Sequence, residues 1–283
     1  MPGWRPFSDD GVAVKAAADL TNAYNNPRYT TPGNTPKVTC GWRRLVYLRP
    51  LDLVLVADTV ESTNPAFEKK VRLHAIDRIE VGGKVERIDE GESVHTDVDG
   101  ATIIVDDTQL SDKNQRTSDL RTGYAELRVK TLFPIGFRYR KIGGREPAGA
   151  VHADFYTPNQ TDGHYHRHIK DFWIKDFSEG FIPNHRTLNW APERPLETRV
   201  PEQATTFRGG YGRWRMEVEP SQPSRTDHFL NMMRPSLQPK ASLPVIERVE
   251  TTGQFGSLIR DTGRTYRVAF GKDTLDPPVV ERR

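Results

Sequence analysis

The sequence of 283 residues contains little cysteine, no long apolar run and little net charge. A single cysteine, Cys40, excludes an internal disulfide but leaves the cellular compartment open. We expect Cys40 to act as a small apolar residue near the start of a strand. No apolar run is long enough to span a membrane, and the first residues lack the apolar segment of a signal peptide.

The formal net charge of +3 is small for this length, and the basic residues are interspersed with acidic ones. Nucleic acid is therefore not an expected partner, although a local basic strip could contact an acidic polymer. A chain of this length can bury a sizeable core, either as one large β domain or as two smaller ones.

Short alternating segments dominate the sequence, and no long amphipathic helix is apparent. In the segment 213–219, Trp214, Met216 and Val218 alternate with charged residues, which is typical of a strand with one exposed face. Frequent turn residues separate such segments. The sequence predicts an all-β fold, an antiparallel β-sandwich of many short strands with a long irregular loop around residues 145–210.

We expect residues 1–235 to form the sandwich, and residues 236–283 to form a linker and a final hairpin that packs on it. Residues 13–18 suit either a short helical turn or a strand. Residues 79–81 and 84–88 flank Gly82–Gly83, and this arrangement predicts a second hairpin.

The loop around 145–210 carries the densest group of candidate site residues. His164, His166 and His168 would share one face of an extended segment, where imidazoles can bind zinc. Two other interpretations remain open: histidines that hydrogen-bond locally, and a loop that contacts glycan without metal. Trp173, Arg186, Trp190 and Tyr211 suit sugar stacking and carboxylate binding, or alternatively core packing.

Three segments resemble the C-terminal β-sheet part of heparinase II/III-like polysaccharide lyases. They are residues 22–29 (NAYNNPRY), the apolar stretch 47–62 with its charged end, and residues 67–74 (FEKKVRLH). The match returns weakly at 212–220 and 227–232, and it does not cover residues 145–210. The helical toroid and the catalytic motifs that precede this part in the family have no counterpart here.

The resemblance implies a protein that acts on uronic-acid-containing polysaccharide by β-elimination, located in the periplasm or outside the cell. The expected partners are an acidic polysaccharide or oligosaccharide and a toroid-bearing chain or a second copy of this chain. No catalytic residue of the family transfers to this sequence. If the chain is catalytic by itself, the candidates are His166 or His74 as base, Tyr165 as acid, and Arg186 or Arg72 on the carboxylate.

Two alternatives remain beside a lyase that needs a toroid. One is a standalone β-sandwich that binds glycan or serves a structural role without turnover. The other is an independent enzyme with its own site around residues 164–185. His74 could equally be a structural histidine hydrogen-bonded to the backbone.

Overall fold

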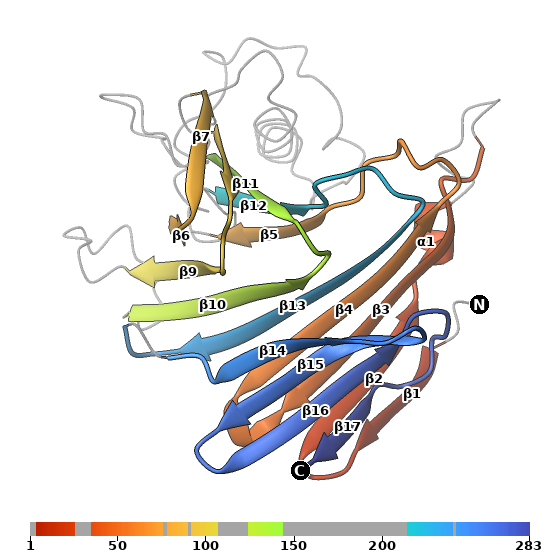
Figure 1. The fold of residues 1–283 in the computed structure, drawn as a ribbon, viewed down its shortest axis with the longest axis vertical. Helices are drawn as coiled ribbons and strands as arrows, with labels where there is room; N and C mark the ends of the chain where they lie inside the picture. The colour runs from red at the N-terminus through yellow and green to blue at the C-terminus, as the bar shows by residue number, and fades with distance from the viewer. Residues whose placement is uncertain are drawn as a thin grey trace, which may run out of the picture.

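The computed structural model describes residues 4–25, 35–75, 78–89, 92–106, 124–143, 214–239 and 242–283. These residues form three antiparallel sheets (Figure 1), which confirms the predicted all-β fold. Helical structure within them is limited to α1 (Thr21–Tyr24) and the short 3-10 turn η2 (Arg49–Leu51). No helix in these ranges is long and apolar enough to cross a membrane.

The central sheet has eight strands. Their spatial order is β1 (Trp4–Asp9), β2 (Ala13–Asp19), β3 (Val38–Leu48), β4 (Leu53–Ser62), β13 (Thr226–Ser236), β10 (Tyr124–Phe133), β9 (Ala101–Asp106) and β6 (Arg78–Val81). The apolar stretch noted in the sequence forms β4, between β3 and β13. Its residues Leu53, Leu55 and Ala57 are fully buried, whereas Val54 and Val56 on the other face are half-buried.

Two smaller sheets complete the fold. The five-stranded sheet has the order β5 (Val71–Ala75), β12 (Trp214–Glu219), β11 (Arg138–Gly143), β8 (Glu92–Thr96) and β7 (Lys84–Asp89). The four-stranded sheet has the order β14 (Val245–Glu250), β15 (Gln254–Asp261), β16 (Arg264–Gly271) and β17 (Val279–Arg282).

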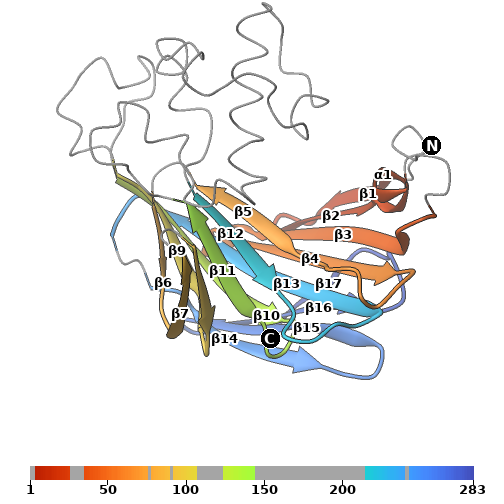
Figure 2. The same cartoon turned by 90° about the horizontal axis from the view of Figure 1, so that it is seen from above.

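The smaller sheets pack on opposite faces of the central sheet (Figure 2). Strand β13 shows the reason, because successive side chains of a strand point to opposite faces. Phe229 joins the apolar cluster with the five-stranded sheet, whereas Leu230 and Met232 join the cluster with the four-stranded sheet. The molecule therefore has two separate apolar cores, one on each face of a shared central layer.

The predicted hairpin at Gly82–Gly83 is wrong. Strand β6 pairs with β9 in the central sheet, and β7 pairs with β8 in the five-stranded sheet. The turn therefore connects two layers. Gly83 has a φ of +83°, and a Cβ there would lie 2.4 Å from the Thr96 carbonyl oxygen, so the crossing requires glycine.

Residues 13–18, which suited either a helical turn or a strand, form a strand, β2, with Ala13 and Ala17 buried.

The C-terminal segment contains more strand than the sequence suggested. Part of the expected linker extends β13 to Ser236, and another part forms β14, so the final unit is a four-stranded sheet. The prolines in this C-terminal stretch obscured the alternation of apolar and polar residues that would have predicted these strands.

A buried arginine joins the four-stranded sheet to the central sheet. Arg44 on β3 is fully buried and donates hydrogen bonds to Thr59 Oγ1 at 2.6 Å and to the Thr274 carbonyl at 3.0 Å. Its guanidinium lies 5.5 Å from the Phe255 ring centroid and 5.6 Å from that of Phe270. Burial lowers the pKa of Arg44 to about 10, so the group remains charged at neutral pH.

Candidate functional site

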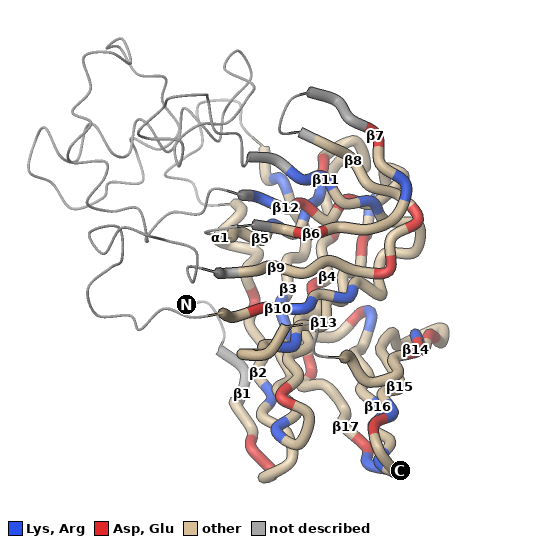
Figure 3. The backbone as a smooth tube through the Cα atoms, turned by 90° about the vertical axis from the view of Figure 1, so that its left-hand side faces the viewer, with Lys and Arg blue, Asp and Glu red and all other residues tan. Residues whose placement is uncertain are grey.

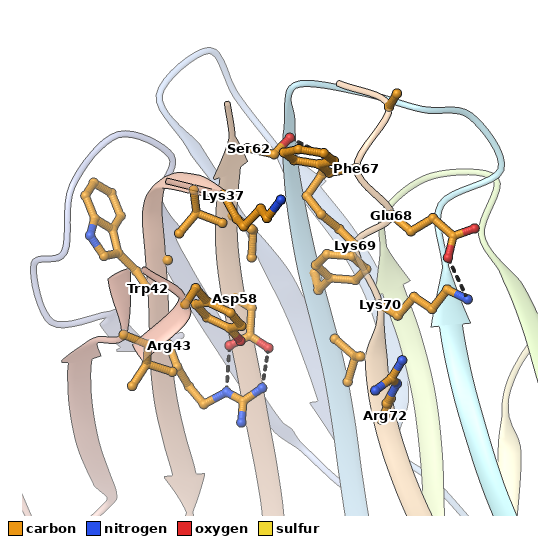
Figure 4. A pocket seen from close by; sticks show the side chains of 18 residues that line it. Lys37, Trp42, Arg43, Asp58, Ser62, Phe67, Glu68, Lys69, Lys70 and Arg72 are labelled. Atoms are coloured by element: carbon orange, nitrogen blue, oxygen red, sulfur yellow. Dashed lines mark hydrogen bonds and ion pairs between the residues drawn. The ribbon is translucent and has the colours of Figure 1, made fainter. Parts of the chain in front are cut away.

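A pocket of about 660 Å³ lies where the edge strand β5 approaches the surface of β3 and β4 (Figure 4). Its wall comes from α1, β3, β4, the loop 63–70 and β5, together with one residue of β13. The basic residues of the lining are Lys37, Arg43, Lys69, Lys70 and Arg72, and the aromatic ones are Tyr24, Trp42, Phe67 and Phe229.

The pocket gathers the three segments that carry the sequence resemblance. Residues 22–29 contribute Tyr24, the apolar stretch 47–62 contributes Asp58 and Ser62 from β4, and residues 67–74 contribute the opposite wall. Strand β4 pairs with both β3 and β13, which brings these segments to one place. The resemblance is therefore concentrated around a single concave surface.

Arg43 and Asp58 form a closed ion pair at the pocket. Arg43 Nε and Nη2 donate to the two carboxylate oxygens of Asp58 at 2.7 and 2.8 Å. The Asp58 side chain is 8% exposed, and its hydrogen bond with Arg43 raises the pKa of the guanidinium. Because the fork of Arg43 is occupied, this pair shapes the pocket and adds no net charge.

Lys69 is also fully engaged. Its ammonium lies 3.2 Å from Asp227 Oδ2 and 3.1 Å from Ser62 Oγ, and it donates a further hydrogen bond to the Ser224 carbonyl. Both side chains of the Lys69–Asp227 pair are less than a tenth exposed. Lys69 therefore attaches the loop 63–70 to the start of β13 and is not available to a ligand.

Lys37 and Tyr24 belong to the α1 and β3 side of the pocket, and Phe67 belongs to the loop 63–70 on the opposite side. The Lys37 ammonium lies 4.8 Å from the Phe67 ring centroid, and among the described residues it has no carboxylate partner. Tyr24 is 55% exposed. A Cβ on Gly41 would lie 3.2 Å from the Tyr24 ring, so the glycine makes room for that ring beside β3. This part of the pocket offers the Lys37 ammonium group together with the aromatic faces of Tyr24 and Phe67.

Lys70 and Arg72 are the basic residues on the β5 side of the pocket. The Lys70 ammonium lies 3.1 Å from Glu217 and 2.9 Å from Glu219. Burial alone would lower the pKa of Lys70, but the two carboxylates outweigh it and raise that pKa. Arg72 contacts Glu217 through Nε at 3.0 Å, and its side chain is 58% exposed. Its two Nη groups have no ion-pair partner among the described residues, so Arg72 can donate to a ligand.

Of the candidates named from the sequence, Arg72 lines the pocket. His74 is exposed on the same outward face of β5, opposite Arg215 of β12, and it does not line the pocket. The structure thus brings Arg72 and His74 to one face. The remaining candidates lie outside the described residues: His164, Tyr165, His166, His168, Trp173, Arg186, Trp190 and Tyr211.

The zinc site at His164, His166 and His168 stays a prediction, because these residues lie outside the described ranges. Within the described ranges, no group of three or more His, Cys, Asp or Glu side chains could hold a metal ion. His95 has a structural role, because its ring contacts Ser93 Oγ at 2.9 Å and the Gly82 carbonyl at 3.3 Å. Burial raises the pKa of Cys40 to about 12, which keeps this thiol protonated and unreactive.

Two glutamates are more buried than the sequence predicts, and some lining residues were not marked by any motif. Glu217 and Glu219 alternate with apolar residues and were expected to be exposed, yet they are 1% and 3% exposed. They lie among basic side chains, which cover them. The pocket residue Lys37 carried no signal in the sequence, whereas Phe67 and Lys70 were marked only by their place in the segment 67–74.

Comparison with known proteins adds little. No protein-family model matches the chain, and no curated protein sequence matches it. Among solved structures, the chain is similar to heparan sulfate lyase HepC from Pedobacter heparinus, with 10% sequence identity and a TM-score of 0.40, which is a weak structural resemblance. The match covers 97% of this chain and 28% of that lyase chain.

Proposed function

We propose that the pocket binds an acidic sugar, and that the chain is the β-sheet portion of a polysaccharide lyase-like protein acting on uronic-acid-containing polysaccharide. The observation that carries the proposal is the pair of basic groups with open donors, Lys37 and Arg72, beside the aromatic rings of Tyr24 and Phe67. Arginine and lysine bind carboxylate or sulfate groups, and aromatic faces stack on sugar rings.

β-Elimination needs more than this pocket. A base removes the proton beside the carboxylate, an acid protonates the leaving oxygen, and positive groups neutralise the carboxylate. Lys37 and Arg72 suit the last role. No histidine belongs to the described lining, Asp58 is held by Arg43, and Glu68 pairs with Lys70. The proposal therefore places the base and acid on a toroid or in the loop around 145–210, where His166 and Tyr165 are candidates.

A standalone glycan-binding protein is the second candidate function. The same observation favours it, because the described lining holds groups that bind an acidic sugar and no histidine. The two candidates share the ligand and differ in turnover. They are separated by an ultraviolet assay for unsaturated uronate on a panel of acidic polysaccharides, with and without zinc. A rising signal that His166→Ala abolishes would identify a complete enzyme, and a flat signal favours binding alone or a missing toroid.

We expect Lys37→Gln and Arg72→Gln each to weaken binding of a uronic acid oligosaccharide by about 10-fold. Each variant removes one charge-assisted hydrogen bond, which contributes about 1.5 kcal/mol. Isothermal titration calorimetry measures the effect. Lys84→Gln is the matched control, since Lys84 on β7 is 81% exposed, pairs with Asp97 and lies outside the pocket. Wild-type affinity in both pocket variants, or an equal loss in the control, would contradict the proposal.

A further inference from the structure

The outward face of the five-stranded sheet carries a cluster of basic side chains on β5, β11 and β12 and on the residue that precedes β5. Lys and Arg positions gather along β11 and β12 (Figure 3). In register, Glu217 of β12 lies between Arg72 of β5 and Arg140 of β11, and Glu219 lies opposite Arg138. The basic members of this outward face are Lys70, Arg72, Arg138, Arg140 and Arg215. Two buried carboxylates therefore serve five basic groups.

The two glutamates are buried and the arginines are the exposed members. The side chains of Glu217 and Glu219 are 2% and 4% exposed, whereas those of Arg72 and Arg138 are 58% and 41% exposed. Glu68 beside Lys70 is also exposed. A ligand that approaches the two buried glutamates first meets the guanidinium groups of Arg72 and Arg138.

The pairing geometry leaves donors available. Arg72 and Arg138 each contact a glutamate through Nε, at 3.0 and 2.9 Å. Neither places its Nη groups in an ion pair with a described residue. A guanidinium has five N–H donors, so the Nη donors of both side chains are free to bind an anion in the planar, two-point manner typical of arginine. The glutamates thus hold the arginines in place through Nε, and the Nη donors stay available to a ligand.

This outward face continues from the pocket. Lys70 and Arg72 line the pocket, and the same two residues pair with Glu217 and Glu219. From the strand spacing, the Cα atoms of Arg72 and Arg138 lie about 12 Å apart, because they are two strands and two residues apart. The two side chains therefore present separate anchoring positions along one face.

We infer that the outward face of the five-stranded sheet is a second anion-binding subsite, filled by the acidic groups of a polysaccharide whose neighbouring sugar occupies the pocket. The inference rests on the proposed function and extends it, because it specifies a ligand longer than one sugar with acidic groups along its length. Arg72 connects the two subsites, and Arg138 is the distal anchor.

The test is the dependence of affinity on ligand length. Calorimetry compares a uronic acid monosaccharide, the disaccharide and longer oligomers on the wild-type chain, Arg138→Gln, Arg138→Lys and Arg49→Gln. We expect wild-type affinity to increase with length, and Arg138→Gln to lose about 5- to 10-fold for the long oligomers alone, from one missing charge-assisted contact. Arg138→Lys keeps the charge and recovers part of the loss. Arg49→Gln, which breaks an exposed pair with Asp9 far along the central sheet, leaves every affinity unchanged.

Thermal unfolding of each variant checks the fold. Glu219 retains Lys70 and Arg140 as partners when Arg138 is replaced, so the melting temperature is expected to hold. An unchanged length dependence in Arg138→Gln overturns the second subsite while the pocket proposal stands. An equal loss at every length, or equal binding of single-stranded DNA, also overturns it. No binding of any acidic sugar by the wild-type chain removes the proposed function as well.

Discussion

Lys69→Met is expected to lower the free energy of unfolding by about 3–5 kcal/mol, the cost of removing one partner of a buried ion pair. The Lys69 and Asp227 side chains are 6% and 8% exposed and lie 3.2 Å apart. Without the ammonium, Asp227 keeps a buried charge with no counter-ion, and the Ser224 carbonyl loses a donor. Urea denaturation followed by circular dichroism measures the change.

Two further variants test whether the uncompensated charge of Asp227 causes this loss of stability. Lys84→Met breaks an exposed pair, in which Lys84 and Asp97 are 81% and 66% exposed, and should cost less than about 1 kcal/mol. The double variant Lys69→Met with Asp227→Leu removes the uncompensated charge and should recover a large part of the loss. A loss for Lys69→Met as small as that for Lys84→Met would show that the buried pair does not hold the pocket loop in place.

Acidification from pH 6.5 to 4.5 is expected to destabilise the protein through His228. Burial first, and then the charges of Lys272 and Arg44, lower the pKa of His228 to about 4. In this pH range the unfolded chain binds a proton that the folded chain excludes, so stability decreases as the pH falls and levels off below pH 4. The total loss is about 2 kcal/mol, which allows for the partial exposure of the ring.

The geometry around His228 explains the preference for the neutral ring. Arg44 donates to Thr59 Oγ1 at 2.6 Å, and the Thr59 hydroxyl lies 3.1 Å from His228 Nδ1, where it can donate to a neutral ring whose proton is on Nε2. A proton on Nδ1 would compete for that contact beside a buried guanidinium. His228→Asn should flatten the dependence of unfolding free energy on pH between 6.5 and 4.5. Glu219, whose pKa is lowered, contributes only at lower pH. An identical slope in the variant would contradict this account.

Local pattern was sufficient for most of the strands. The alternation of Met216 and Val218 with charged residues predicted β12, and the final hairpin expected within residues 236–283 corresponds to the pairing of β15 with β16. Both depend on interactions between residues close in sequence, which side-chain periodicity and turn chemistry encode directly. The low cysteine content was equally readable, because it is a property of composition.

The sequence by itself thus determined the fold class, the positions of most strands and the three segments that resemble a lyase. Tertiary structure decided the rest. Alternation shows that a residue has a face but not which layer covers it, so Glu217 could not be placed under basic side chains or Arg44 between two sheets. The pocket arises when β4 pairs with β3 and β13 and when β5 pairs with β12 in a different sheet. Those pairings join residues far apart in the chain, and their energy comes from burial that no local segment contains.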